Sequence, residues 1–198
     1  ACQPRLAHGL RADAFRIDHI LGFFRIWSIP MHAVEGIMGN FVPALPVHIN
    51  EFGQRGMWFD YQRLCRPFIN DSVLAELMGG DTESLKPYLN DIGEGRFELK
   101  EAFNTQRKVE AHFEQLEKND HHNRIKTGLF DCISNVIFFE VEGSNGQQFH
   151  FRISMSSTTS FRYLDDDSKR KLDDLYVNYF FRRQDDFWRQ EALAKLPY

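Results

Sequence analysis

The chain has 198 residues, of which 42% are apolar, and a net charge of −4 from 24 basic and 28 acidic side chains. This composition suits a globular protein with one sizeable core and excludes a disordered chain. The acidic balance argues against a nucleic-acid-binding protein, which would need a basic face.

The cysteines and the hydropathy pattern predict a cytoplasmic protein. Cys2, Cys65 and Cys132 are few, odd in number and widely spaced, which favours free thiols in a reducing compartment over disulfides or a zinc site. No apolar run is long enough to span a membrane, and the N-terminus lacks a signal-peptide pattern. Aromatic residues make up 14%, with 19 Phe against 3 Trp and 6 Tyr. That excess of Phe predicts a large apolar core, with a sugar-binding cleft as the alternative.

The first quarter of the chain mixes one expected strand with loop composition. Residues 14–18 predict a short strand that delivers its last side chains to a sheet edge. The apolar residues 23–27 predict a helical turn or two, ended by Pro30. Residues 31–56 are punctuated by glycines and prolines, and their length indicates a functional loop.

From residue 60 the pattern becomes helical. Asp71 and Ser72 predict the start of a helix that ends at the glycines 79–80, and residues 81–84 predict the cap of another that carries Leu85 and Leu89. Residues 93–95 read as a turn without a phosphate-loop signature. Residues 99–118 predict an amphipathic helix. The pair of histidines at 121–122 predicts a solvated loop in preference to a metal site.

Towards the C-terminus the spacing of apolar residues changes to the pattern of strands. Residues 136–141, a glycine-containing loop at 143–146 and the alternating residues 149–153 predict a β-hairpin. Three aspartates at 165–167 then cap a long helix that runs to Leu196. The predicted class is α+β, mostly helical with one β-hairpin. Because a lone strand at 14–18 cannot satisfy its own backbone groups, we expect its partners outside this chain and the chain to be part of something larger.

Arg16 and Asp18 are the candidate chemical groups. They lie two apart on the predicted strand, so both side chains point to one side. A neighbouring arginine favours the ionised carboxylate, and an ionised carboxylate at the end of a barrel strand can attack an electrophilic carbon. An ordinary buried ion pair between an arginine and an aspartate would give the same sequence pattern.

The surrounding residues carry a resemblance to a known family. The run AFRIDH at 14–19, followed by Gly22-Phe23 and by Trp27-x-Ile29-Pro30, resembles the nucleophile segment of glycoside hydrolase family 77, the 4-α-glucanotransferases. Further stretches resemble the type-2 subgroup, which carries a long insertion that short bacterial amylomaltases lack. These stretches are 55–69, 103–109, 129–139, 149–155 and 179–197.

The resemblance implies a fold and a division of the chain. The fold would be a fragment of an α-amylase-superfamily TIM (β/α)8 barrel carrying the type-2 insertion. Residues 1–52 would be a barrel segment with the nucleophile strand and an active-site loop, and 53–178 a helical insertion with a β-hairpin near 136–153. Residues 179–198 would be the return helix of the barrel. The acid/base Glu of the family would follow Tyr198, so the isolated fragment is expected to be inactive.

The resemblance also assigns roles to individual residues. Asp18 would be the nucleophile of a retaining double displacement on α-1,4-glucans, with Arg16 holding it ionised. His19 would bind sugar hydroxyls or the pocket wall. Trp27 would be a sugar platform or a core residue. The loop residues expected to line acceptor subsites, with a plain loop as the alternative, are Glu35, Gly36 and Asn40. No metal or organic cofactor is implied.

Two other functions stay open from the sequence. The insertion could be a helical interaction or oligomerisation module without catalysis, or the enzyme could be an α-glucan hydrolase. The expected partners are α-1,4-glucan oligosaccharides, the rest of the barrel chain and, through exposed apolar edges, a second copy of the chain, with no nucleic acid and no membrane.

Overall fold

The computed structural model describes residues 25–195, and the predicted strand at 14–18 lies outside this range. The eight strands of the described range are β1 (Ile26–Ser28), β2 (Asn40–Val42), β3 (Val47–His48), β4 (Ile69–Asn70), β5 (Leu89–Gly93), β6 (Arg96–Leu99), β7 (Phe138–Glu140) and β8 (Gln148–Phe151). Its α-helices are α1 (Asn50–Gln54), α2 (Tyr61–Cys65), α3 (Asp71–Leu77), α4 (Gln106–Phe113), α5 (Asp120–Ser134), α6 (Thr159–Arg162), α7 (Asp166–Asn178) and α8 (Gln184–Lys195). Short 3-10 turns are η2 (Gly36–Met38), η3 (Lys86–Tyr88), η4 (Glu101–Phe103) and η5 (Met155–Ser157), and a π-helical segment, η6 (Tyr179–Arg183), joins α7 to α8.

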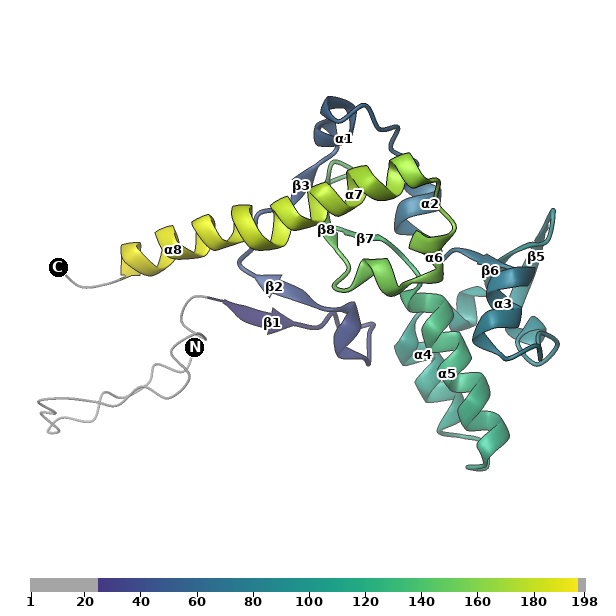
Figure 1. Cartoon of the computed structure of the whole chain (residues 1–198). Helices are drawn as coiled ribbons and strands as arrows, with labels where there is room; N and C mark the ends of the chain where they lie inside the picture. Colours follow the sequence, from purple (N-terminus) through teal and green to yellow (C-terminus); the bar gives the residue numbers. More distant parts are fainter. Residues whose placement is uncertain (1–24, 196–198) are drawn as a thin grey trace, which may run out of the picture.

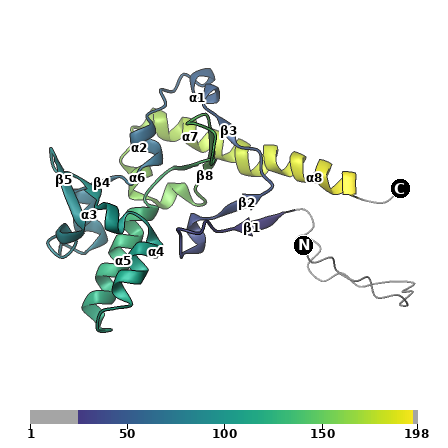
Figure 2. The same cartoon turned by 180° about the vertical axis from the view of Figure 1, so that it is seen from behind.

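The described strands form three small antiparallel sheets. Their orders are β1-β2, β3-β8-β7 and β4-β6-β5. The α7–η6–α8 segment runs as one long rod across the molecule, with the β1-β2 hairpin beside α8 (Figures 1 and 2). The helices α4 and α5 lie side by side at another edge. The part of the chain between 25 and 195 is therefore a mixed α/β structure and does not by itself form a barrel.

Side-chain caps explain where several helices begin. The Asn70 carboxamide oxygen accepts from the Val73 N–H at 2.8 Å, and the Asp165 carboxylate accepts from the Ser168 N–H at 2.9 Å. Each cap satisfies a donor that the first helical turn leaves without an intrahelical partner. Residue Asn119 caps α5 in the same way.

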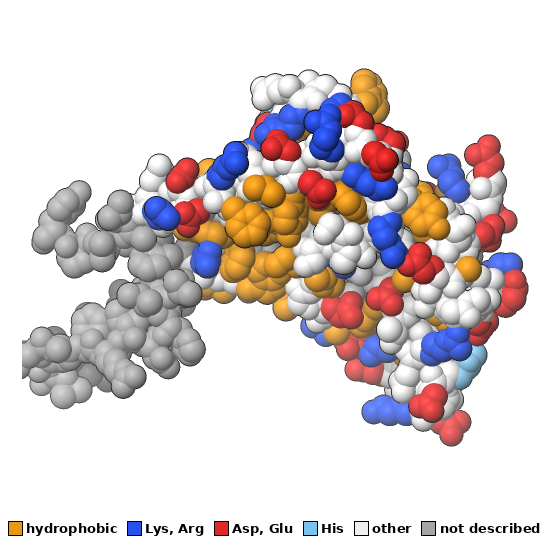
Figure 3. Space-filling view, viewed as in Figure 1, with side chains coloured by type: hydrophobic (Ala, Val, Ile, Leu, Met, Phe, Trp, Pro, Cys, Tyr) orange, Lys and Arg blue, Asp and Glu red, His pale blue; other side chains and the backbone are white. Residues whose placement is uncertain are grey.

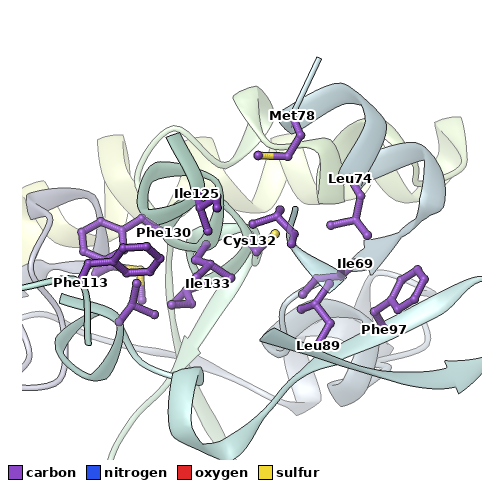
Figure 4. Close-up of a cluster of buried hydrophobic side chains, with 14 of the residues drawn as sticks. Ile69, Leu74, Met78, Leu89, Phe97, Phe113, Ile125, Phe130, Cys132 and Ile133 are labelled. Atoms are coloured by element: carbon purple, nitrogen blue, oxygen red, sulfur yellow. The ribbon is translucent and has the colours of Figure 1, made fainter. Parts of the chain in front are cut away.

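Two hydrophobic clusters hold the described residues together. The first, drawn in Figure 4, packs α3, α4 and α5 against the β4-β6-β5 sheet around Leu74, Leu129 and Ile133. The second lies under α7, where Phe52, Phe138 and other phenylalanines are buried with Leu172. Because Ala33 and Met38 belong to the first cluster and Val47 to the second, both clusters include residues from either side of position 52.

Several predictions about elements are confirmed. The helix ending at the glycines 79–80 is α3, and the strands expected at 136–141 and 149–153 contain β7 and β8, which pair as a hairpin. The long C-terminal helix is present as α7, η6 and α8, with Asp165 as its cap. The buried phenylalanines of the second cluster agree with the expectation of a large aromatic core.

Other predictions are wrong. Residues 23–27 were expected to be helical, yet β1 begins at Ile26 because the chain there pairs with β2. The helix expected to carry Leu85 and Leu89 is the turn η3, after which Leu89 pairs with Leu99. The strands β1 and β2, and β5 and β6 around Glu94, form two further hairpins, so the expectation of a single hairpin is also wrong.

The bounds of one predicted helix and the content of two predicted loops differ as well. The amphipathic helix predicted over 99–118 is the shorter α4, preceded by η4. The histidines expected in a solvated loop, His121 and His122, lie in the first turn of α5. The predicted loop at 31–56 contains β2, β3 and α1.

Candidate functional site

Of the seven residues predicted for the site, four lie in the described range. Asp18, Arg16 and His19 fall outside it. Trp27, Glu35, Gly36 and Asn40 are brought together by the β1-β2 hairpin and the connection between its strands. We call residues 25–46 the hairpin segment.

Trp27 is fixed inside the hairpin segment. Its indole Nε1 donates to the Gly36 carbonyl oxygen at 3.0 Å, and its ring meets Phe41 edge-on with centroids 4.8 Å apart. A Cβ added at Gly39 would lie 2.5 Å from the same Nε1 and 2.6 Å from the Ser28 carbonyl oxygen, so only glycine fits beneath the ring. The polar atom of the indole is therefore already used in holding the turn.

Gly36 and Asn40 lie on either side of that turn. A Cβ at Gly36 would meet no atom within 4 Å, so this position faces open space. The Asn40 side chain donates to the Phe41 carbonyl oxygen at 3.0 Å and lines a narrow crevice together with Trp27 and Trp188.

Glu35 is held by a glutamine from α4. The Gln106 side-chain oxygen accepts from the backbone N–H groups of Val34, at 2.8 Å, and Glu35, at 2.9 Å. Its Nε2 donates to the Glu35 carboxylate at 2.6 Å. Gln106 is 0% exposed, so these bonds are made away from competing water.

A second buried glutamine holds the other end of the hairpin segment. The Gln184 side chain accepts from the Leu45 N–H at 2.9 Å and donates to the Leu45 carbonyl oxygen at 2.6 Å. Trp188, one turn further along α8, donates from Nε1 to the Pro43 carbonyl oxygen at 2.8 Å. The Arg25 guanidinium lies 4.2 Å over the Trp188 ring.

Two charged groups, Asp131 of α5 and Arg152 after β8, feel the charge of Glu35. Asp131 is half-buried, and burial together with the charge of Glu35 raises the pKa of its carboxyl group. Burial lowers the pKa of Arg152, whose guanidinium donates to the carbonyl oxygens of Ser134, Ile153 and Ser154. The negative charges of Glu35 and Asp131 oppose this lowering of the Arg152 pKa.

The described part of the candidate site contains no metal-ligand cluster. Among residues 25–195, no group of three or more His, Cys, Asp and Glu side chains is placed to hold a metal ion. None of the helices in this range is long and apolar enough to cross a membrane.

Sequence reasoning missed the residues that position the hairpin segment, above all Gln106, Gln184 and Trp188. A signal existed for Gln106, because it lies three positions before Val109 and seven before Phe113, on the buried face of α4. A polar side chain on an apolar stripe predicts a specific partner. No comparable signal gave the identity of that partner, 71 positions away in the sequence.

Comparison with known proteins identifies the family. The family model for 4-alpha-glucanotransferases, glycoside hydrolase family 77, matches residues 5–197. The chain belongs to this family. The match includes the AFRIDH run at 14–19, which confirms the resemblance seen in the sequence.

A relative in the same family is the 4-alpha-glucanotransferase DPE2 of Oryza sativa subsp. japonica. It is 38% identical over 192 residues, which cover 93% of this chain and 20% of the rice protein. The chain thus spans about a fifth of the length of this curated relative. No solved structure matches the chain significantly.

Proposed function

We propose that the chain is part of a 4-α-glucanotransferase that moves glucosyl or glucan units between α-1,4-glucans such as maltose, maltodextrin and glycogen. The observation that carries this proposal is the family match over residues 5–197, which contains both the candidate nucleophile and the hairpin segment. The transferase name of the rice relative supports the same reaction class.

In the proposed mechanism, Asp18 performs the covalent step. Its carboxylate oxygen bonds to the anomeric carbon while the bond from that carbon to the glycosidic oxygen breaks. A second carboxylic acid of the enzyme protonates the leaving oxygen. It then takes the proton from the 4-hydroxyl of the acceptor sugar, whose oxygen displaces Asp18 with a second inversion. Arg16 keeps Asp18 ionised, and His19 binds sugar hydroxyls.

The hairpin segment contributes the acceptor side of the proposed site. Gly36 presents an open face, and Asn40 and Glu35 supply an amide and a carboxylate suited to sugar hydroxyls. Because the Trp27 indole N–H is bonded to Gly36, we assign Trp27 the role of shaping this turn, with only its exposed ring surface open to a sugar. Transfer exceeds hydrolysis if these elements keep water from the covalent intermediate.

The hairpin segment and the neighbouring η6 also have apolar surface for the rest of the enzyme. Figure 3 shows a hydrophobic area over the long α7–α8 rod and the strands beside it. Phe181 is 70% exposed, and Ile26 and Val42, which are register partners in the hairpin, are 61% and 49% exposed. Surface of this kind marks a contact. We assign that contact to the remainder of the same longer enzyme, since the matched relative is about five times as long as the aligned segment.

The transferase proposal is tested with the intact enzyme that contains this chain. Wild type and Asp18→Asn are incubated with maltose and glycogen, and released glucose is measured. We expect a loss of at least about 1,000-fold for Asp18→Asn, because no nucleophile remains. Asp173→Asn, at an exposed position of α7, is the matched control and should keep full activity. An Asp18→Asn enzyme with more than a tenth of wild-type activity contradicts the proposal.

A further inference from the structure

A polar cleft lies outside the hairpin segment. It has a volume of about 570 Å³ and is formed by α2, the connection from α2 to β4, and strands β5 and β6. All of its lining residues fall between positions 60 and 104. Clefts of this size accommodate small organic ligands, since ligand sites commonly enclose roughly 300–1,000 Å³.

Three arginines line this cleft: Arg63, Arg66 and Arg96. Several arginines in the described range have carboxylate partners, such as Arg107 with Glu110 at 2.8 Å. None of the three cleft arginines has a carboxylate oxygen within 4.0 Å among residues 25–195. Arg66 lies over the Tyr61 ring and feels the charge of Glu140, but no carboxylate of the described residues contacts it. Three arginines that line one cleft without a contacting carboxylate are suited to an anionic ligand.

Arg63 is the least exposed of the three. Its guanidinium donates to the Ser160 hydroxyl at 2.7 Å and to the Ser160 carbonyl oxygen at 2.6 Å, and it lies 3.8 Å over the Phe68 ring. Asp60 does not neutralise it by contact, because the Asp60 carboxylate accepts from the Arg63 backbone N–H at the start of α2. Burial lowers the pKa of Arg63 to about 10, so the group remains charged at neutral pH. These contacts fix the guanidinium but bring no negative charge to it, so an anionic ligand would stabilise this half-buried cation further.

The rest of the lining suits hydroxyl groups. Asp60, Gln62, Glu98 and Asn104 provide acceptors, and Phe97 and Leu99 provide apolar surface. Three arginines against two carboxylates leave an excess of one positive charge, which favours a ligand with a single anionic group. The cleft is also far larger than one phosphate requires, so it has room for a second, hydroxyl-rich part of a ligand.

We propose that this cleft binds a phosphate monoester of a sugar, with the phosphate on the arginines and the sugar hydroxyls on the carboxylate and amide side chains. A phosphate monoester carries about −1.5 to −2 charges at pH 7 and three acceptor oxygens, which match guanidinium forks. The same chemistry occurs on a free sugar phosphate and on a phosphorylated glucan chain. The inference does not rest on the proposed transferase reaction, because none of the cleft residues belongs to the hairpin segment.

The test measures binding by calorimetry to the intact enzyme that contains this chain. The probes are glucose 6-phosphate, phosphorylated maltodextrin, unphosphorylated glucose and inorganic phosphate. The cleft variant is Arg66→Ala with Arg96→Ala, two exposed side chains whose loss spares the cores. The matched control is Arg107→Ala with Arg170→Ala, which removes two exposed arginines elsewhere.

We expect saturable binding of at least one phosphorylated sugar to wild type. Loss of two charge-assisted contacts should weaken it by about 100-fold in the cleft variant, with less than about a two-fold change in the control. Binding of glucose 6-phosphate identifies a free metabolite as the source, and binding of phosphorylated maltodextrin alone identifies a glucan chain. Transferase activity should be equal in both variants.

Three results would overturn the proposal. The first is the absence of saturable binding of either phosphorylated sugar to wild type. The second is equal affinity of wild type and the cleft variant for the phosphorylated probe. The third is binding of inorganic phosphate or glucose as tight as that of the phosphorylated sugars. Such a result would show that the sugar or the phosphate group, respectively, contributes nothing to binding. A failed transferase proposal would instead appear as an active Asp18→Asn enzyme, without an effect on these binding curves.

Discussion

Replacement of Gln106 by leucine should release the part of the hairpin segment that carries Glu35. Leucine nearly preserves the volume of this fully buried side chain, so the main loss is that of three hydrogen bonds of 2.8, 2.9 and 2.6 Å. Two backbone N–H groups and one carboxylate then lose their partner. An unsatisfied buried donor costs about 1–3 kcal/mol.

The magnitude follows from where these groups lie. Val34 and Glu35 are half-buried, so water replaces part of the lost bonding, and the low end of the range applies to each N–H. We therefore expect local opening of the segment to become easier by about 2 kcal/mol, which is a factor of about 30 in the opening equilibrium.

Amide hydrogen exchange in the intact enzyme measures this opening directly. The protection factors of the Val34 and Glu35 amides should fall about 30-fold in Gln106→Leu. Gln115→Leu changes an exposed glutamine near the end of α4 and should leave both factors unchanged. Protection that stays within two-fold of wild type in Gln106→Leu would refute the reasoning, because the two N–H groups would then be held by something other than Gln106.

Gln106→Glu separates the acceptor role from the donor role. The variant keeps an oxygen for the two backbone donors, but it places a carboxylate where Nε2 now donates to Glu35. Two ionised carboxylates at this separation repel each other, so protection should be low at neutral pH. It should recover in acid, where one shared proton restores a hydrogen bond. Protection independent of pH would show that the Glu35 carboxylate does not take part.

The structure supports three further predictions. Gly39→Ala should expel the Trp27 ring from its seat, because the new Cβ would lie 2.5 Å from Nε1, and tryptophan fluorescence should shift to longer wavelength. Burial raises the pKa values of Cys65 and Cys132 to about 12, so both thiols should react with alkylating agents far more slowly in native than in denatured protein at pH 8. Burial raises the pKa of Glu51, but its hydrogen bonds and cationic neighbours outweigh this and lower it, so its stabilising contribution is present above the unfolded value and is lost as pH falls through the folded one. Protection of α1 against exchange should therefore decline below about pH 4 in wild type and show no such decline in Glu51→Gln.

Elements with local signals could be predicted from the sequence. The α7–α8 rod has a capping aspartate, Asp165, and a helical repeat of apolar residues, so neighbouring positions suffice to define it. The β7-β8 hairpin has an apolar run at 136–141, alternation at 149–153 and a glycine turn between them, which again are local features. Both were predicted correctly.

Elements that depend on distant partners could not be predicted. Leu85 and Leu89 have helical spacing, yet Leu89 is paired with Leu99 in a sheet, and this pairing outweighs the local preference. In the same way, Ile26 joins a strand because Val42 lies opposite, although Pro30 suggested the end of a helix. The residues that hold the candidate site have the same dependence, since the partner of Gln106 lies in another part of the chain.

The two buried glutamines show how the predicted insertion and the hairpin segment depend on each other. A loop rich in glycine and proline makes few backbone hydrogen bonds of its own, so buried side chains must satisfy its polar groups. An amide side chain both accepts and donates hydrogen bonds without a net charge and has a longer reach than a hydroxyl, which suits glutamine to both positions. Gln184 holds Leu45 from α8, whereas Gln106 holds Val34 and Glu35 from a helix of the predicted insertion. A shift of α4 must therefore move Glu35, and in the proposed transferase the insertion helps to set the geometry on the acceptor side.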